Sequence, residues 1–204
     1  SIADGESIGI LYKSLEILHI GKEDLIMNAT MILNRAEELR EELIENRRTL
    51  HSYAETGFDL PQTTAFVEKK LREYGLTPVR CGKAGITCVI GDPQKGKCFL
   101  LRGDMDALPM TEESGLPFAA QNGHCHSCGH DTHTAMLLAA ARLLSEHAGE
   151  LPGCVKLMFQ PAEEIFEGSK DMIASGVLEN PRPDAALMIH VAAGMPLPAG
   201  TVVV

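Results

Sequence analysis

Apolar residues at helical spacing mark two segments in the first half of the chain. Between residues 22 and 50, leucines, isoleucines and methionines recur mostly three, four or seven positions apart, with acidic residues and arginines between them. This spacing predicts an amphipathic helix. A second helix is expected to begin at Pro61, which suits a first helical turn, and to end at Gly75.

Short apolar segments bounded by turn residues follow. Residues 77–81, 86–90 and 98–101 predict three strands, and the last is apolar without alternation, which is typical of a strand in the middle of a sheet. Residues 132–147 predict a helix that is apolar on nearly every side, so it should be buried.

The second half of the chain continues the alternation. We expect strands at residues 155–159, 185–189 and 201–204, and a short helix at residues 168–174. Strands that alternate with helices predict an α/β fold, with a sheet covered by helices on both faces.

Composition excludes several classes of protein. The 204 residues are 45% apolar and 23% charged, the balance of a globular chain with one domain or two small ones. A formal net charge of -10 argues against binding to nucleic acid, whose phosphates attract Lys and Arg. The longest unbroken apolar run, residues 135–141, falls far short of the roughly 20 residues that span a bilayer. We therefore expect neither a nucleic-acid partner nor a membrane span.

The six cysteines are too sparse for a scaffold held by disulfides. Cys81, Cys88, Cys98 and Cys154 each stand alone among apolar or strand-forming residues, and we interpret them as reduced and buried. The first twenty residues also lack the basic head and long apolar block of a secretory signal. Together these features predict a cytoplasmic protein.

Histidines and cysteines gather in one short stretch. Four of the eight histidines lie within residues 123–133, together with Cys125 and Cys128. Imidazole and thiolate are preferred ligands of zinc and similar metals. Cys128 and His130 are two apart in a glycine-containing stretch, and an extended backbone would aim both side chains toward one metal. A structural zinc knuckle, or a redox pair of Cys125 and Cys128, is the alternative; no second Cys pair accompanies it, and histidines surround it.

Further polar residues follow the predicted strands. Glu163 and Glu164 come after residues 155–159, His190 after residues 185–189, and Asp104 and Asp106 after residues 98–101. Ligand sites of α/β sheets gather at the carboxyl ends of strands. Consecutive glutamates cannot share a face, so one could bind metal while the other moves protons. The two aspartates could bind the metal themselves or orient its ligands. Solvated acidic turns, and an ordinary core or edge histidine at position 190, are the alternatives.

Four motifs in a fixed order resemble the peptidase M20 family. They are residues 102–109 (RGDMDALP), 126–133 (HSCGHDTH), 160–164 (QPAEE) and 188–190 (MIH). The most similar branch is that of the amidohydrolases that cleave N-acyl amino acids, including hippurate and auxin-conjugate hydrolases. The resemblance spans residues 45–204, which we expect to form the N-terminal part of a metallohydrolase catalytic domain. Residues 1–44 would then be an N-terminal helical extension.

The resemblance implies a site with two divalent metal ions, zinc or manganese, with cobalt or nickel as alternatives. By motif position, Cys128 would bridge the metals, His130 and His190 would complete one metal site, and Glu164 would bind the other metal. Glu163 would be the general base. Water held between two cations loses its proton near neutral pH, and a neighbouring carboxylate can pass that proton to the leaving amine.

The expected function is therefore metal-dependent hydrolysis of the amide bond of N-acyl amino acids or short peptides. Chains of the family continue into a lid domain that mediates dimers and then return with one more histidine ligand. We accordingly expect these residues to be a front half without the lid, with an exposed sheet edge, and the full-length form to be a homodimer. A catalytically inactive metal-binding fragment is the alternative function, and a zinc-stabilised interaction module is a weaker one.

Overall fold

The computed structural model describes residues 29–192, 196–198 and 201–203. The chain divides into two compact units, Glu38–Val191 and a second formed by Ser1–Glu37 with Ala192–Val204. All the described strands and all the candidate site residues belong to the unit Glu38–Val191. The expectations for residues 1–28 and for Val204 lie outside the described residues.

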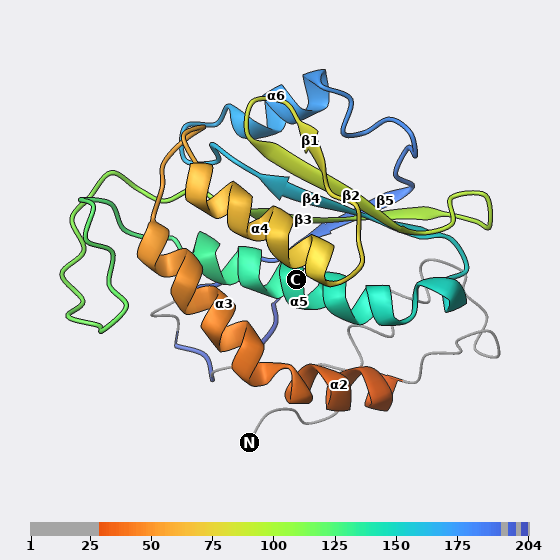
Figure 1. Cartoon of the computed structure of the whole chain (residues 1–204), viewed down its shortest axis with the longest axis horizontal. Helices are drawn as coiled ribbons and strands as arrows, with labels where there is room; N and C mark the ends of the chain where they lie inside the picture. The colour runs from red at the N-terminus through yellow and green to blue at the C-terminus, as the bar shows by residue number, and fades with distance from the viewer. Residues whose placement is uncertain (1–28, 193–195, 199–200, 204) are drawn as a thin grey trace. The chain divides into compact units, whose positions relative to one another are not determined.

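Helices alternate with strands along the chain, as the hydrophobic pattern predicts (Figure 1). The helices are α2 (Ala29–Glu38), α3 (Arg40–Tyr53), α4 (Pro61–Glu73), α5 (His130–Glu146) and α6 (Gly168–Ala174), and a 3₁₀ turn spans Ala148–Glu150. The strands are β1 (Val79–Cys81), β2 (Gly85–Gly91), β3 (Cys98–Asp104), β4 (Cys154–Gln160) and β5 (Ala185–Met188).

The five strands form one mixed sheet in the order β1-β2-β4-β3-β5. β3 pairs in parallel with β4 and β5, whereas β2 pairs antiparallel with β1 and β4. β3 is an interior strand, in agreement with its unbroken apolar run, although β4 occupies the middle position. Because β3, β4 and β5 are parallel, their carboxyl ends lie at one edge of the sheet.

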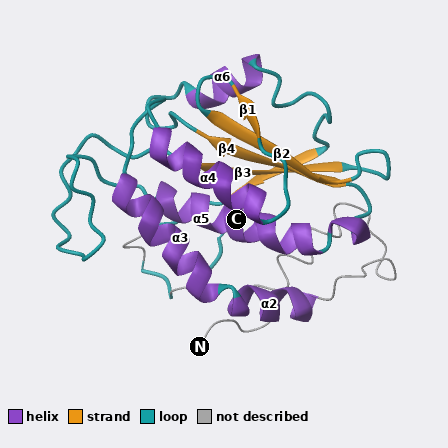
Figure 2. Ribbon diagram, in the orientation of Figure 1, coloured by secondary structure: helices purple, strands orange, loops and turns teal. Residues whose placement is uncertain are grey.

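Helices cover both faces of the sheet, which confirms the predicted α/β architecture (Figure 2). α5 packs against β2, β3 and β4, and α4 lies beside it over β2. α6 packs against β4 from the opposite face. α3 packs on α4 and α5 rather than on the sheet. The buried helix predicted from its apolar surface is thus α5, which is enclosed by the sheet and two other helices.

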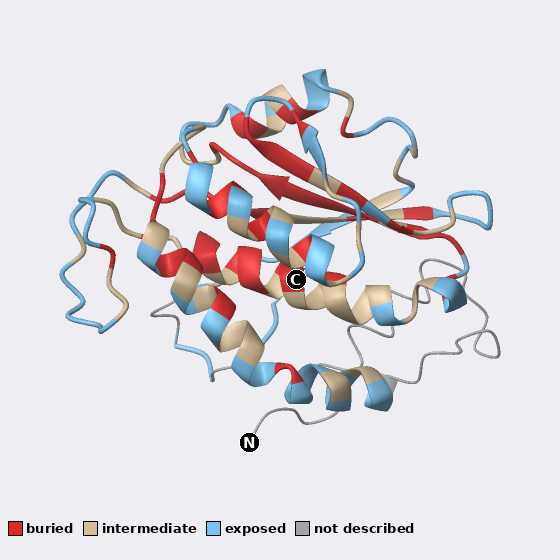
Figure 3. Cartoon of the chain, viewed as in Figure 1, coloured by how far each residue is buried: buried red, intermediate tan, exposed pale blue. Residues whose placement is uncertain are grey.

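The core is densest along β4, where buried residues follow one another (Figure 3). Leu157 and Phe159 are fully buried. Met158 points to the opposite face, because successive side chains of a strand alternate, and forms a cluster with Met172 and Val177. Both faces of the strand are therefore covered, and even its polar residues are buried.

The start of α4 shows how the sequence fixes a helix end. Pro61 is its first residue, as predicted, and the preceding loop contributes the Glu55 carboxylate. This carboxylate accepts hydrogen bonds from the backbone N–H groups of Gln62 at 3.0 Å and Thr63 at 2.8 Å. It satisfies two amides that have no partner within the helix and places negative charge at the positive end of the helix dipole.

Two elements differ from the sequence prediction. The long helix expected at residues 22–50 is interrupted at Leu39, so that α2 and α3 are separate within the described residues. The amphipathic spacing continues across this residue, so periodicity alone does not reveal the break. Residues 201–203 are not a strand; Thr201 instead donates a backbone hydrogen bond to the carbonyl of Pro198. β-branched residues favour an extended backbone, but a strand also needs a neighbouring strand for its backbone hydrogen bonds. The described residues provide no such neighbour here.

No helix among the described residues is long and apolar enough to cross a membrane. All six cysteines are free, and the four interpreted as reduced fillers, Cys81, Cys88, Cys98 and Cys154, are buried. Burial raises the pKa of Cys88, which keeps its thiol protonated and unreactive.

Candidate metal centre

The candidate residues converge at the carboxyl ends of the three parallel strands. Asp104 ends β3, Glu163 and Glu164 follow β4, and His190 follows β5. His130 joins them as the first residue of α5. The strand order and the direction of the strands thus bring together residues that are up to 86 positions apart in the sequence, as the strand-end argument predicts.

His130 lies at the centre of this group and is completely buried. Its Nδ1 is 2.9 Å from the backbone carbonyl oxygen of Asp106, which can only accept a hydrogen bond, so Nδ1 carries a proton. Its Nε2 has no hydrogen-bond partner and faces carboxylate oxygens of Glu163 at 3.9 Å and Glu164 at 3.8 Å. These distances are too long for hydrogen bonds.

Among the described residues, three sets of potential ligand atoms share His130, and two of them consist only of the predicted ligands and the predicted base. The ligand atoms of Cys128, His130 and His190 all lie within 4.8 Å of one another, and so do those of His130, Glu163 and Glu164. Cys128 Sγ is 3.3 Å from His190 Nε2. The four residues that the sequence analysis names as ligands, together with the expected base, therefore stand in one place.

The charges of this group favour a cation. Burial lowers the pKa of His130, but its hydrogen bond to Asp106 and the charges of Asp104 and Glu164 raise it further than burial lowers it. Burial and the charge of Glu164 raise the pKa of the Cys128 thiol to about 11. The carboxylates thus favour the protonated forms of both groups, as they would favour a bound cation.

Asp106 holds both glutamates by their backbones. Its carboxylate oxygens accept the N–H of Glu163 at 2.9 Å and the N–H of Glu164 at 3.1 Å. Asp106 is fully buried. It is therefore an orienting residue and not a member of either ligand group, and both of its carboxylate oxygens are engaged.

Asp104 and His133 lie beside His130 and are hydrogen-bonded to each other. His133 Nδ1 is 2.6 Å from Asp104 Oδ1, and His133 Nε2 accepts the backbone N–H of Val191 at 2.9 Å. Arg102 Nη1 lies 2.8 Å from the other oxygen of Asp104. Although the ligand atoms of Asp104, His130 and His133 also lie within 4.8 Å of one another, both ring nitrogens of His133 already have partners.

The alternative cysteine pair is not brought together with the site. Cys125 is in none of the ligand groups found among the described residues. Its backbone N–H and carbonyl pair instead with the carbonyl and N–H of Leu108 in an isolated bridge. The geometry therefore favours Cys128 over a Cys-x-x-Cys knuckle.

A buried charged network next to the site was missed by sequence reasoning. His51 of α3 lies between Asp131, at 2.7 Å, and Glu112, at 3.0 Å, and Arg47 Nε is 2.8 Å from the same Asp131 oxygen. Arg47 and His51 are four residues apart on one face of α3. Two charged residues at helical spacing beside apolar Leu50 are the sequence signal that could have revealed this network.

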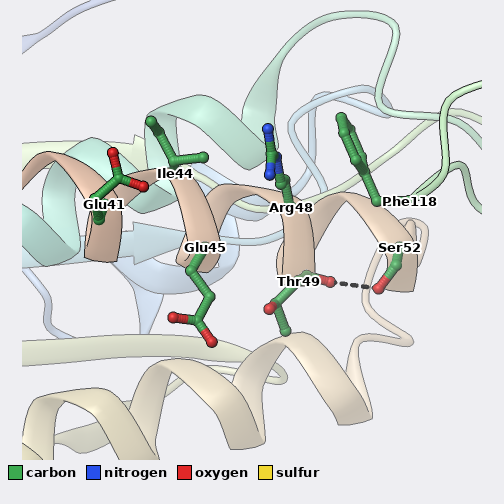
Figure 4. A pocket seen from close by; sticks show the side chains of 7 residues that line it. All are labelled: Glu41, Ile44, Glu45, Arg48, Thr49, Ser52 and Phe118. Atoms are coloured by element: carbon green, nitrogen blue, oxygen red, sulfur yellow. Dashed lines mark hydrogen bonds between the residues drawn. The ribbon is translucent and has the colours of Figure 1, made fainter.

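A hollow in the surface lies elsewhere on the unit. It measures about 420 Å³ and is formed by α3 and the loop that carries Phe118 (Figure 4). Its lining residues are Glu41, Ile44, Glu45, Arg48, Thr49, Ser52 and Phe118. None of the candidate ligands contributes to it, so the metal centre is defined by its ligand atoms and not by a deep cavity.

Comparison with known proteins places this geometry in a family. Residues 100–204, about half of the chain, match peptidase family M20/M25/M40. The chain is 43% identical over 155 residues to an N-acetyl-L-cysteine deacetylase of Bacillus subtilis, and the match covers 74% of this chain and 36% of that protein. It is 36% identical over 156 residues to an N-acyl-L-amino acid amidohydrolase of Geobacillus stearothermophilus, covering 75% and 42% of the two chains.

A solved structure of the same family has a similar fold. The Bacillus subtilis YXEP protein, a dinuclear metal binding peptidase from the M20 family, superposes with a TM-score of 0.73 at 35% identity, over 79% of this chain and 45% of that one. The α/β fold and the ordered motifs are thus those of an M20-type hydrolase fold. The chain belongs to peptidase family M20/M25/M40 and spans less than half the length of these relatives.

Proposed function

We propose that this chain supplies the metal-binding and catalytic residues of a metal-dependent amidohydrolase. The observation that carries the proposal is a pair of buried atoms without partners, His130 Nε2 and Glu164 Oε1, which face each other at 3.8 Å. A buried polar atom without a partner is costly, and here a lone pair and a carboxylate oxygen point at the same space. Divalent cations held at this site would satisfy both atoms.

The proposed ligands are Cys128, His130, His190 and Glu164, which would hold two divalent ions. Thiolate, imidazole and carboxylate together suit zinc or manganese, with cobalt and nickel as alternatives. When bound, such ions supply Lewis-acid polarisation of a carbonyl group and acidify water. The dinuclear site named for the Bacillus subtilis relative supports this assignment.

Glu163 is the proposed general base. Its side chain is about a third exposed, which gives it access to water, and its Oε2 lies 3.9 Å from His130 Nε2. From there the carboxylate can accept the proton of the attacking water and return it to the nitrogen of the leaving amine. Asp106 keeps the carboxylate in place because it binds the backbone N–H of Glu163.

The proposed substrates are small N-acyl amino acids or dipeptides, on the basis of the activities named for the relatives. Residues 45–204 would form the N-terminal part of the catalytic domain, and residues 1–44 a helical extension. In its full-length form we propose a homodimer. The location proposed from the reduced cysteines is the cytoplasm.

The test is hydrolysis of N-acetyl and N-benzoyl amino acids by the full-length protein after loading with Zn²⁺ or Mn²⁺. We expect release of free amino acid that stops when the metal is removed by a chelator and returns when it is added back. Metal binding without hydrolysis of any substrate would instead support the inactive metal-binding alternative.

A further inference from the structure

We propose that His133 is a positioning residue, which anchors the peptide that follows His190 and so aims the His190 imidazole at Cys128. This inference rests on the proposed function, because it assigns a support to one of the proposed ligands. It gives His133 a role distinct from that of His130, although both stand on the first turn of α5.

His190 needs such a support because of its place in the fold. It follows β5, whose one partner among the described strands is β3, and it is exposed to solvent. Its Nδ1 donates a hydrogen bond to the backbone carbonyl of the next residue, Val191, at 2.7 Å, and this local bond does not tie the ring to another element. Its Nε2 nevertheless lies 3.3 Å from Cys128 Sγ. An exposed imidazole keeps one orientation only if its backbone is held.

His133 provides the hold through its ring. A backbone N–H can only donate, so the 2.9 Å contact between Val191 N and His133 Nε2 requires a lone pair on Nε2. The proton of the ring is then on Nδ1, which donates to Asp104 at 2.6 Å. This tautomer is the one that anchors Val191, and it leaves His133 no free nitrogen for a metal.

The anchor is itself fixed by buried groups. His133 is 3% and Asp104 1% exposed, and Arg102 pairs with Asp104 at 2.8 Å. Arg102 Nε also donates to the side-chain oxygen of Gln160 at 2.9 Å, at the end of β4. Residues at the ends of β3 and β4 therefore fix the orientation of His133. His133 in turn holds the backbone that follows β5.

Packing at the same point agrees with this role. The rings of His133 and His190 meet edge to face, with centroids 4.6 Å apart and planes at 70°. Val191 lies over Gly129, where an added Cβ would stand 2.5 Å from Val191 Cγ2. The backbone after His190 is thus seated directly against the segment that carries Cys128 and His130.

The experiment compares two substitutions of His133, each of which can keep one of the two hydrogen bonds that the ring makes. In His133→Gln the side-chain oxygen can still accept the N–H of Val191, because it reaches the position of Nε2. In His133→Asn the amide can replace only Nδ1 and bond to Asp104. Both variants are neutral amides at the same buried position, so a purely structural role should disturb them alike.

Co²⁺ is titrated into the wild-type chain, both variants and His190→Ala, with detection by the visible absorption bands of the bound ion. We expect His133→Asn to weaken Co²⁺ binding roughly 10- to 100-fold, the usual effect of losing a residue that orients a ligand, and to change the spectrum toward that of His190→Ala. His133→Gln should stay near the wild type. If the wild type binds Co²⁺, equal affinities, or equal losses in both variants, would overturn the proposal.

Hydrogen exchange of the Val191 amide, measured by NMR on the metal-free chain, separates this inference from the proposed function. Protection in the wild type and His133→Gln, with loss in His133→Asn, supports the anchor even if the wild type binds no Co²⁺, a result that would sink the proposed function alone. Equally fast exchange in all three proteins would overturn the anchor, whatever the titration shows.

Discussion

Glu163 and Glu164 show how two neighbouring residues of one type acquire different surroundings. One oxygen of Glu164 is buried without a partner, whereas the Glu163 side chain is about a third exposed. The sequence predicts this division from their adjacency after a strand. It does not reveal that Asp106 binds the backbone N–H groups of both glutamates. Any residue type except proline offers such a group, so the sequence at these positions does not indicate the contact.

Substitution of each glutamate by glutamine should separate the two roles in an active full-length protein. We expect Glu163→Gln to keep its metal content and to lower turnover roughly 10²-fold or more, the scale of general acid–base catalysis. Glu164→Gln should lose metal, because an amide is a weaker ligand than a carboxylate. Metal analysis and initial rates measure both effects, and near-normal turnover of Glu163→Gln would show that another group is the base.

At the scale of elements, periodicity and turn residues predict the helices and strands of the described residues well. α6 begins and ends at the predicted residues, and α4 begins at Pro61. The break at Leu39 and the absence of a strand at residues 201–203 were not predictable, because both depend on which segments lie next to them. The contact of α3 with α5 through His51 is likewise a tertiary property.

The network around His51 should make stability depend on pH in a defined window. The hydrogen bond to Asp131 raises the pKa of His51, so its contribution is complete below the ordinary histidine pKa of about 6.5 and is lost as the pH rises through the raised value. Burial opposes ionisation of Glu112, but the bond from His51 lowers the pKa of Glu112 to about 2. The Glu112 contribution is present above about pH 4.5 and is lost as the pH falls toward 2.

Thermal unfolding across pH tests this linkage. We expect Glu112→Gln to lower the melting temperature most between about pH 4.5 and 6.5, where both charges are present, with a smaller effect at high pH and at low pH. Glu113→Gln, at an exposed neighbouring position, is the matched control and should change little at any pH. A Glu112→Gln effect that does not vary with pH would contradict the charged network.

For the molecule as a whole, the α/β class and the gathering of the candidate ligands at strand ends follow from the sequence, but the strand order does not. β2 pairs antiparallel with β4, an arrangement that hydrophobic patterning alone cannot specify. The order leaves β5 at an edge, with Leu187, Met188 and Ile189 between 42% and 61% exposed. The expectation of an exposed apolar sheet edge is thus met within the described residues.

That edge should make the 204-residue chain self-associate. Unpaired strand edges with apolar side chains are templates for pairing with another chain. We expect sedimentation velocity to show concentration-dependent assembly, and Leu187→Lys with Ile189→Lys to reduce it. Ile173→Lys, which alters an exposed apolar residue on α6, should leave assembly unchanged. A wild-type chain that stays monomeric at every concentration would contradict this prediction.

The central claim, a metal centre that uses Cys128 and not Cys125, is tested most directly by Co²⁺ titration of the chain and two serine variants. A cobalt–thiolate absorption band should develop in the wild type and in Cys125→Ser with similar affinity, and should be absent in Cys128→Ser. Because the pKa of Cys128 is about 11 before metal binds, a proton should be released as this band develops. Equal loss of the band in both variants, or no band in the wild type, would contradict the account.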